Sequence, residues 1–513
     1  MVDRASLTQE DPQRGLFSDR GWAALLFFTV VALAVPGLMA RLGVGPRWVG
    51  VAWALCFIPY GALVLGSAAR PSRRQMRLVL GAVVLASLAS LGAPPLFSDD
   101  VYRYLWDGHV ALSGIDPYAF APNDPEIAEL RTVHWSQINH PEVPTIYPPL
   151  AQALFFLAAL LGGQVWTVQL LGALAHIGCT LWLAYRAPRG GMVAALLFGL
   201  NPLALLETTM MGHLDVVVGL SLALAAVEIV RGRPVRAVLW TGAASAMKLV
   251  GIICAPLLSL SSRHWVFPAL VLALLPLFFV AQAGHASGEP GGMHHYARRW
   301  AGNAGGFLLV ERACRFVVDG VANRNGSGPG RITLDPLRPM LESIHGSDLD
   351  PRLGFRGPKK PPADIATFPR HFASGMLARA TCVSLAILFL LWLMRRRGDP
   401  ILSFRAMVFA VLLLSPQVHP WYLLWLLPLE ALARRYAGFV WSAIVLVAYA
   451  PLEGWLIARE WVLSPWIVGL EYGTLGVILM SEYMGDRGNI FASIYRWSRR
   501  LFAKAPQIGD STS

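Results

Sequence analysis

The stretch GWAALLFFTVVALAVPGLMA, residues 21–40, contains no charged side chain. As a helix it is long enough to cross the hydrocarbon layer of a bilayer, which is about 30 Å thick. Similar apolar runs recur almost to the end of the chain. Hydrophobic residues make up 55% of the 513 residues and charged residues 14%, whereas a typical soluble domain has about 25% charged residues. The sequence therefore predicts an all-α, polytopic membrane protein and excludes a soluble globule.

The net charge of +12 comes from 43 Lys and Arg against 31 Asp and Glu. The basic residues stand in short clusters between apolar runs, a pattern typical of cytoplasmic loops and not of a nucleic-acid-binding face. The strongest clusters lie at residues 70–77, 231–236, 395–397 and 487–504. Placing all of them in the cytoplasm predicts roughly twelve crossings, with both termini cytoplasmic. No nucleic-acid partner is expected.

This orientation divides the chain into segments that alternate between the membrane and its two sides. They are a cytoplasmic N-terminus (1–20), first transmembrane helices (21–97), an extracytoplasmic loop with an interfacial helix (98–164), a transmembrane core (165–283), a large extracytoplasmic loop (284–375), C-terminal transmembrane helices (376–483) and a basic amphipathic cytoplasmic tail (484–513).

Two apolar stretches do not fit a simple count of crossings. Residues 149–163 are too few for a regular span, so they predict an interfacial or re-entrant helix. Residues 237–260 form either one span or a shallow broken hairpin. The hairpin is favoured because it keeps the arginines at both of its ends in the cytoplasm.

An acidic pair opens the first external loop in SDDVYRYLWDG, residues 98–108. Adjacent carboxylates repel, so at least one of Asp99 and Asp100 tends to have a raised pKa or a cationic partner, as a general base or a cation ligand needs. In a helix, Arg103 and Asp107 fall on or near the same face. The alternative, about equally supported, is that one carboxylate only caps the helix.

Other ionisable or aromatic residues on the same predicted side are further candidates. Tyr147, in IYPPL, is held by two prolines at the membrane boundary, where a tyrosine is most often only an anchor. His213 and Asp215, in GHLD, lie close to hydrocarbon, where ionisable residues suggest function. Lys248 is the only lysine deep in an apolar run, and it either contacts a phosphate or snorkels to the interface.

Two more motifs, YARRW at residues 296–300 and QVHPWY at residues 417–422, face this side as well. Adjacent arginines such as Arg298 and Arg299 suit phosphate oxygens. Taken singly, these arginines and the pair His419 and Tyr422 are ordinary interface residues. The gathering of all these motifs on one side of the membrane is the stronger indication of a site.

In their order and sidedness, the acidic pair, GIDPY, IYPPL, NPL with GHLD, the intramembrane lysine and HPWY resemble the C-type superfamily of membrane glycosyltransferases. The nearest branch is the bacterial polyprenyl-phosphate-mannose-dependent mannosyltransferases, and the likeness covers residues 98–428. The sequence departs from many relatives in having two extra spans before the acidic loop.

The resemblance implies transfer of a sugar, most often mannose, from a polyprenyl phosphate to a lipid, glycan or protein acceptor. Transfer would occur with inversion on the outer side of the cytoplasmic membrane. Asp99 would be the base with Asp100 beside it, and His213 and Asp215 would shape the acceptor site or a metal site, with Mg or Mn as the candidate ion. Lys248 with Arg298 or Arg299 would contact the donor phosphate.

The chemistry of such a transfer agrees with the residues. Expulsion of a polyprenyl phosphate needs a carboxylate near the nucleophile and cations around the leaving group, and both occur on the required side. No Gly-rich nucleotide-binding loop is apparent, which argues against a cytosolic sugar-nucleotide enzyme. A flippase or transporter of a lipid-linked saccharide is the alternative, although no inverted halves are visible.

Overall fold

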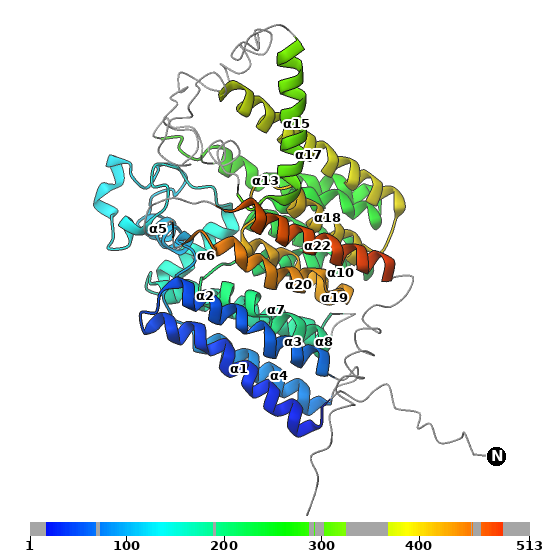
Figure 1. Cartoon of the computed structure of the whole chain (residues 1–513). Helices are drawn as coiled ribbons and strands as arrows, with labels where there is room; N and C mark the ends of the chain where they lie inside the picture. The colour runs from blue at the N-terminus through cyan, green and yellow to red at the C-terminus, as the bar shows by residue number, and fades with distance from the viewer. Residues whose placement is uncertain are drawn as a thin grey trace, which may run out of the picture.

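The computed structural model describes residues 17–67, 72–187, 191–286, 302–324, 368–452 and 463–485, together with positions 292 and 454. In these residues the secondary structure is helical, and the only strand-like feature is an isolated bridge between Gly302 and Gln417. Figure 1 shows a bundle of helices with the loops around α5 (Asp100–Leu112) gathered at one end, on the left. The predicted all-α architecture is confirmed.

Five helical segments are long and apolar enough to cross a membrane, or six if one bent pair is counted as a span. They are α1 (Asp19–Arg41), α2 with α3 (Pro46–Gly66), α7 (Val165–Tyr185), η4 with α13 (Arg263–Ala281) and the part of α17 from Ser374 to Arg396; the bent pair is α8 (Met192–Gly199) with α9 (Pro202–Thr209). This confirms a multi-pass membrane protein. The count is lower than the predicted twelve because several apolar runs form short or broken helices.

The remaining helices are shorter or less apolar. They are α4 (Arg73–Ser90), α6 (Pro149–Leu160), α10 (Val216–Val230), α11 (Pro234–Met247), α12 (Val250–Cys254), η3 (Ala255–Leu260), α15 (Gly305–Arg324), α18 (Pro400–Leu414), η5 (Pro420–Trp425), α19 (Leu427–Ala433), α20 (Ala437–Ile444), η6 (Val445–Tyr449) and α22 (Pro465–Gly485), with η1 (Pro125–Leu130) and η2 (Trp135–Gln137) in the first loop. The full α17 runs Phe368–Arg396. Residues 305–324, which the sequence assigned to an external loop, are therefore helical.

The stretch 237–260 reverses direction at Lys248, which is extended between α11 and α12. Gly251 lies so close to α11 that a Cβ there would stand 2.5 Å from the backbone nitrogen of Ser245 and 2.8 Å from the carbonyl oxygen of Thr241. Only glycine allows this approach. The predicted broken hairpin is confirmed, and Lys248 lies at its apex. Residues 149–160 form the predicted short helix, α6.

Helix α10 lies in the middle of the bundle and is buried on almost every side. This agrees with its apolar composition, because a helix that is hydrophobic all round is a buried one. The η5 segment packs directly on α10, since a Cβ at Gly219 would stand 2.0 Å from the carbonyl oxygen of Leu424. This contact brings the HPWY motif next to the first turn of α10, which follows Asp215.

Candidate functional site

The acidic pair begins α5, but its carboxylates do not cap the helix. Asp99 occupies the N-cap position, and its side chain accepts no capping hydrogen bond. Instead, the amide nitrogen of Asn139 donates to Asp99 Oδ1 at 2.5 Å and to Asp100 Oδ1 at 3.3 Å. Burial, helped by the charge of Asp100, raises the pKa of Asp99 to about 6. A carboxylate with this pKa suits general-base catalysis near neutral pH.

Arg103 and Asp107 form a buried ion pair, with 2.8 Å between Arg103 Nε and Asp107 Oδ1. The other Asp107 oxygen accepts hydrogen bonds from Thr145 Oγ1 at 2.6 Å and from Gln152 Nε2 at 2.9 Å. Thr145 Oγ1 also accepts the backbone N–H of Tyr147, at 3.3 Å. The pair therefore fixes the loop that carries Tyr147, because its charges are satisfied inside the protein.

Lys248 lies in a polar and aromatic cage. Its Nζ is 3.5 Å from Asp215 Oδ1, and it stands 5.6 Å from the ring centre of Tyr147 and 5.2 Å from that of Tyr422. Trp425 Nε1 donates to the same Asp215 oxygen at 2.7 Å. The ammonium points to these groups, and 21% of the Lys248 side chain is exposed. Cation–π contacts of this length favour a fixed position for the charge, and they argue against free snorkelling.

His213 is completely buried and is oriented by Glu207. Its Nδ1 lies 2.9 Å from Glu207 Oε2, and the second Glu207 oxygen accepts the hydroxyl of Tyr449 at 2.6 Å. The opposite ring nitrogen, Nε2, faces Asp100 Oδ2 at 3.9 Å and has no hydrogen-bond partner among the described residues. The ring stacks on Trp421, with 4.0 Å between centroids.

His419 completes the aromatic side of this site. It stacks on Trp421 with 4.2 Å between centroids, and its Nε2 lies 3.0 Å from Gln417 Nε2. The bridge between Gln417 and Gly302 fixes the start of this segment. Trp421 stacks on both His419 and His213, and His213 Nε2 faces Asp100, so these side chains form a continuous row from His419 to Asp100.

The structure brings together eight of the predicted site residues. Asp99, Asp100, Tyr147, His213, Asp215, Lys248, His419 and Tyr422 surround the start of α5 and the hairpin apex, whereas Arg103 and Asp107 support the loop behind them. Arg298 and Arg299 lie outside the described residues. Among the described residues no group of three or more His, Cys, Asp or Glu side chains has the geometry of a metal site, so a divalent ion stays a prediction.

Sequence reasoning included Glu207 in the stretch of the His213 site without giving it a partner, and it missed Asn139 and Trp425. Glu207 carried a usable signal, since an ionisable residue in an apolar run suggests function. Asn139 and Trp425 carried none, because their partners are 40 and 210 positions away in the chain.

Two family models match the chain. The model described as "Alpha-(1->6)-mannopyranosyltransferase, N-terminal domain" matches residues 35–263, and the model described as "MptB C-terminal domain" matches residues 373–470. The first range contains the acidic pair, the His213 motif and Lys248, and the second contains His419 and Tyr422.

Two curated relatives are similar over most of their length. A probable alpha-(1->6)-mannopyranosyltransferase of Mycolicibacterium smegmatis is 27% identical over 453 residues, which cover 79% of this chain and 73% of the relative. Alpha-(1->6)-mannopyranosyltransferase B of Corynebacterium glutamicum is 26% identical over 436 residues, which cover 79% of this chain and 65% of the relative. No solved structure matches significantly.

Proposed function

Because the chain belongs to the alpha-(1->6)-mannopyranosyltransferase family and is a membrane hexosyltransferase, we propose that it uses a polyprenyl-phosphate mannose as its donor. The mannosyl residue goes to a lipid, glycan or protein acceptor with inversion. The reaction takes place at the extracytoplasmic face of the cytoplasmic membrane, with both termini in the cytoplasm. Mannosyl transfer, which the relatives share by name, is favoured over the flippase alternative.

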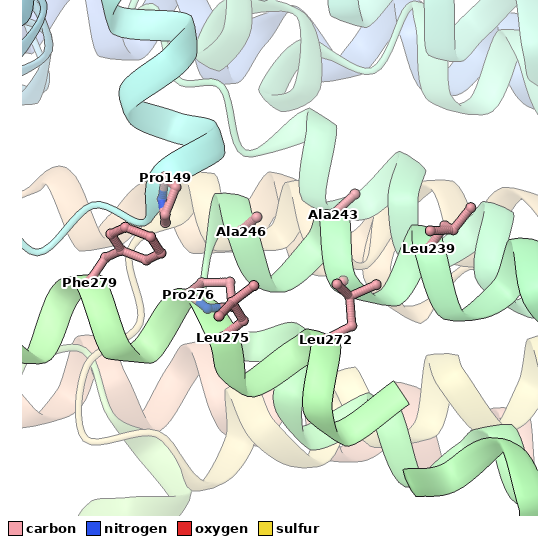
Figure 2. A pocket seen from close by; sticks show the side chains of 9 residues that line it. Pro149, Leu239, Ala243, Ala246, Leu272, Leu275, Pro276 and Phe279 are labelled. Carbon is pink, nitrogen blue, oxygen red and sulfur yellow. The ribbon is translucent and has the colours of Figure 1, made fainter. Parts of the chain in front are cut away.

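An apolar groove that ends at Ala246 and Pro149, close in the chain to Lys248 and Tyr147, is the observation that carries the donor proposal. The groove has a volume of about 330 Å³ and runs between α11 and α13, with the start of α6 across one end. Figure 2 shows Pro149, Ala246 and Phe279 at this end and Leu239 at the other. Its lining consists of Pro149, Leu239, Gly242, Ala243, Ala246, Leu272, Leu275, Pro276 and Phe279.

The groove is open to the outside of the bundle, because Leu239 and Leu275 are 59% and 56% exposed. On a membrane protein such a surface faces lipid, so a prenyl chain can enter from the bilayer. Ala246 is two positions before Lys248, and Pro149 is two positions after Tyr147. A prenyl chain in the groove would bring its phosphate to the end that these two segments form, and we assign the phosphate contact there to the ammonium of Lys248.

The reaction is a single displacement at the anomeric carbon. The acceptor oxygen forms a bond to this carbon, and the bond to the phosphate oxygen breaks with its electron pair on the leaving polyprenyl phosphate. The acceptor proton goes to Asp99, whose raised pKa lets it hold that proton near neutral pH. Lys248, oriented by Asp215 and the rings of Tyr147 and Tyr422, stabilises the negative charge on the leaving phosphate.

The test uses the purified full-length protein with radiolabelled polyprenyl-phosphate mannose and a membrane lipid extract, followed by product analysis. We expect transfer from the polyprenyl donor and none from a mannose nucleotide. Transfer from the nucleotide alone contradicts the proposal. Ala243→Trp, which fills the groove, should raise the KM for a long-chain donor, whereas Leu385→Trp, on the exposed face of α17, should leave it unchanged.

The sidedness is tested with single new cysteines in intact cells. Asn123 in the first loop and Arg236 at the start of α11 are both exposed, and the five native cysteines are buried, which keeps the background low. We expect an impermeant thiol reagent to label Asn123→Cys in intact cells and Arg236→Cys only after lysis. The reverse pattern contradicts the proposed orientation.

A further inference from the structure

A second hollow lies at the other end of the bundle, where two candidate spans meet. The span Arg263–Ala281 begins there, and the span Ser374–Arg396 ends there. The hollow has a volume of about 390 Å³ and is lined by Ser259, Arg263, Leu391, Met394, Arg395 and Arg397. In Figure 1 the connection from α17 to α18 is at the right, whereas α5 is at the left. This hollow is therefore separate from the site of the acidic pair.

The polar part of the hollow is strongly cationic. Arg263, Arg395 and Arg397 all line it, and no ion pair joins any of these three guanidinium groups to a carboxylate within the described part of the chain. Like charges around one hollow repel, so an anion bound in it relieves the repulsion. The planar guanidinium matches phosphate oxygens in pairs. Ser259 Oγ is buried and without a partner among the described residues, so it can donate another hydrogen bond.

The other part of the hollow is apolar. Leu391 and Met394 line it on α17. Beyond its rim the surface stays apolar, since Phe267 is 76%, Leu388 62% and Trp392 47% exposed. These residues belong to the two candidate spans, so they face the acyl chains of the membrane. A free phosphate would use only the arginines, whereas a lipid with an anionic headgroup uses both halves.

We propose that the Arg263, Arg395 and Arg397 hollow binds the phosphate headgroup of an anionic phospholipid. The acyl chains lie along the exposed apolar faces of α13 and α17. Basic hollows between membrane helices at one surface are typical binding places for anionic headgroups. The site is distinct from the sugar donor site, because it lies at the opposite end of the spans.

The experiment measures lipid binding by the full-length protein in nanodiscs of phosphatidylcholine. Photoactivatable phosphatidylglycerol is titrated in, and its crosslinks are mapped by mass spectrometry. We expect crosslinks at residues 259–265 and 391–397, displaced by unlabelled phosphatidylglycerol and not by inorganic phosphate. Displacement by both in equal measure would show a general anion site and overturn the lipid assignment. Absence of crosslinks in these ranges would overturn the site itself.

A matched control comes from the neighbouring arginine. Arg395→Gln with Arg397→Gln removes two phosphate contacts and should weaken the binding of phosphatidylglycerol about thirtyfold. Arg396 ends the same helix, but its guanidinium lies over the ring of Trp392, 5.2 Å from the centroid, and does not line the hollow. Arg396→Gln should change binding less than about threefold, because an exposed surface charge contributes little. An equal loss of phosphatidylglycerol binding in both variants would show that binding depends only on surface charge, and it would refute the site.

Discussion

The rate of mannosyl transfer should depend on pH through the ionisation of the acidic pair. Asp99 must be deprotonated to accept a proton, and its pKa is raised to about 6 by burial and by the charge of Asp100. Activity should therefore rise with pH, reach half of its plateau near pH 6 and fall to about a tenth of the plateau one unit lower. Asp100→Asn removes the like charge, so the half-maximal pH should move downward.

The assay is turnover of polyprenyl-phosphate mannose between pH 4.5 and 8, with donor binding measured separately. Asp99→Asn keeps the shape of the side chain and should lose roughly two to four orders of magnitude in turnover at every pH. Asp100→Asn should stay active with a shifted acid limb. An active Asp99→Asn with an inactive Asp100→Asn would exchange the two roles. Two active variants with unshifted profiles would refute the assignment of the base to this pair.

Three further predictions follow from buried contacts. Lys248→Met should raise the KM for the donor, or lower turnover, by about one to two orders of magnitude, because it removes the charge that meets the phosphate. The loss of donor use should exceed the loss of thermal stability that follows from leaving Asp215 without its cation. Wild-type kinetics at limiting donor would favour the snorkelling interpretation. Glu207→Gln should lower kcat by about tenfold to a hundredfold, because it weakens the hydrogen bond that orients His213. Tyr449→Phe keeps that bond and should lower kcat less. Equal losses of kcat in the two variants would contradict this role of Glu207. Gly108→Ala should lower the free energy of unfolding by roughly 1–3 kcal/mol, measured as a lower melting temperature, because its Cβ would stand 2.2 Å from the carbonyl oxygen of Phe155. The control is Gly81→Ala on α4, whose Cβ would meet no atom within 4 Å, and this variant should be neutral or stabilising.

The sequence by itself determined the features that depend on local composition. The length of each apolar run predicts a membrane helix without reference to its neighbours. The short run at 149–163 and the break inside 237–260 were predicted for the same reason, since length and flanking arginines are local properties. The order of the motifs also led to the glycosyltransferase resemblance, which the family models and relatives confirm.

Tertiary structure alone decided which side chains meet. From the sequence, Asp99 could equally be a helix cap or a base. In the structure its carboxylate accepts a hydrogen bond from Asn139, 40 positions away, and makes no capping hydrogen bond. Arg103 and Asp107 satisfy each other in the interior, and Lys248 faces Asp215 because the hairpin places its apex at the start of α10. Glu207 is bound by Tyr449, 242 positions later. Such pairs depend on how helices pack across the bundle, and helix packing is set by long-range contacts that local composition does not encode.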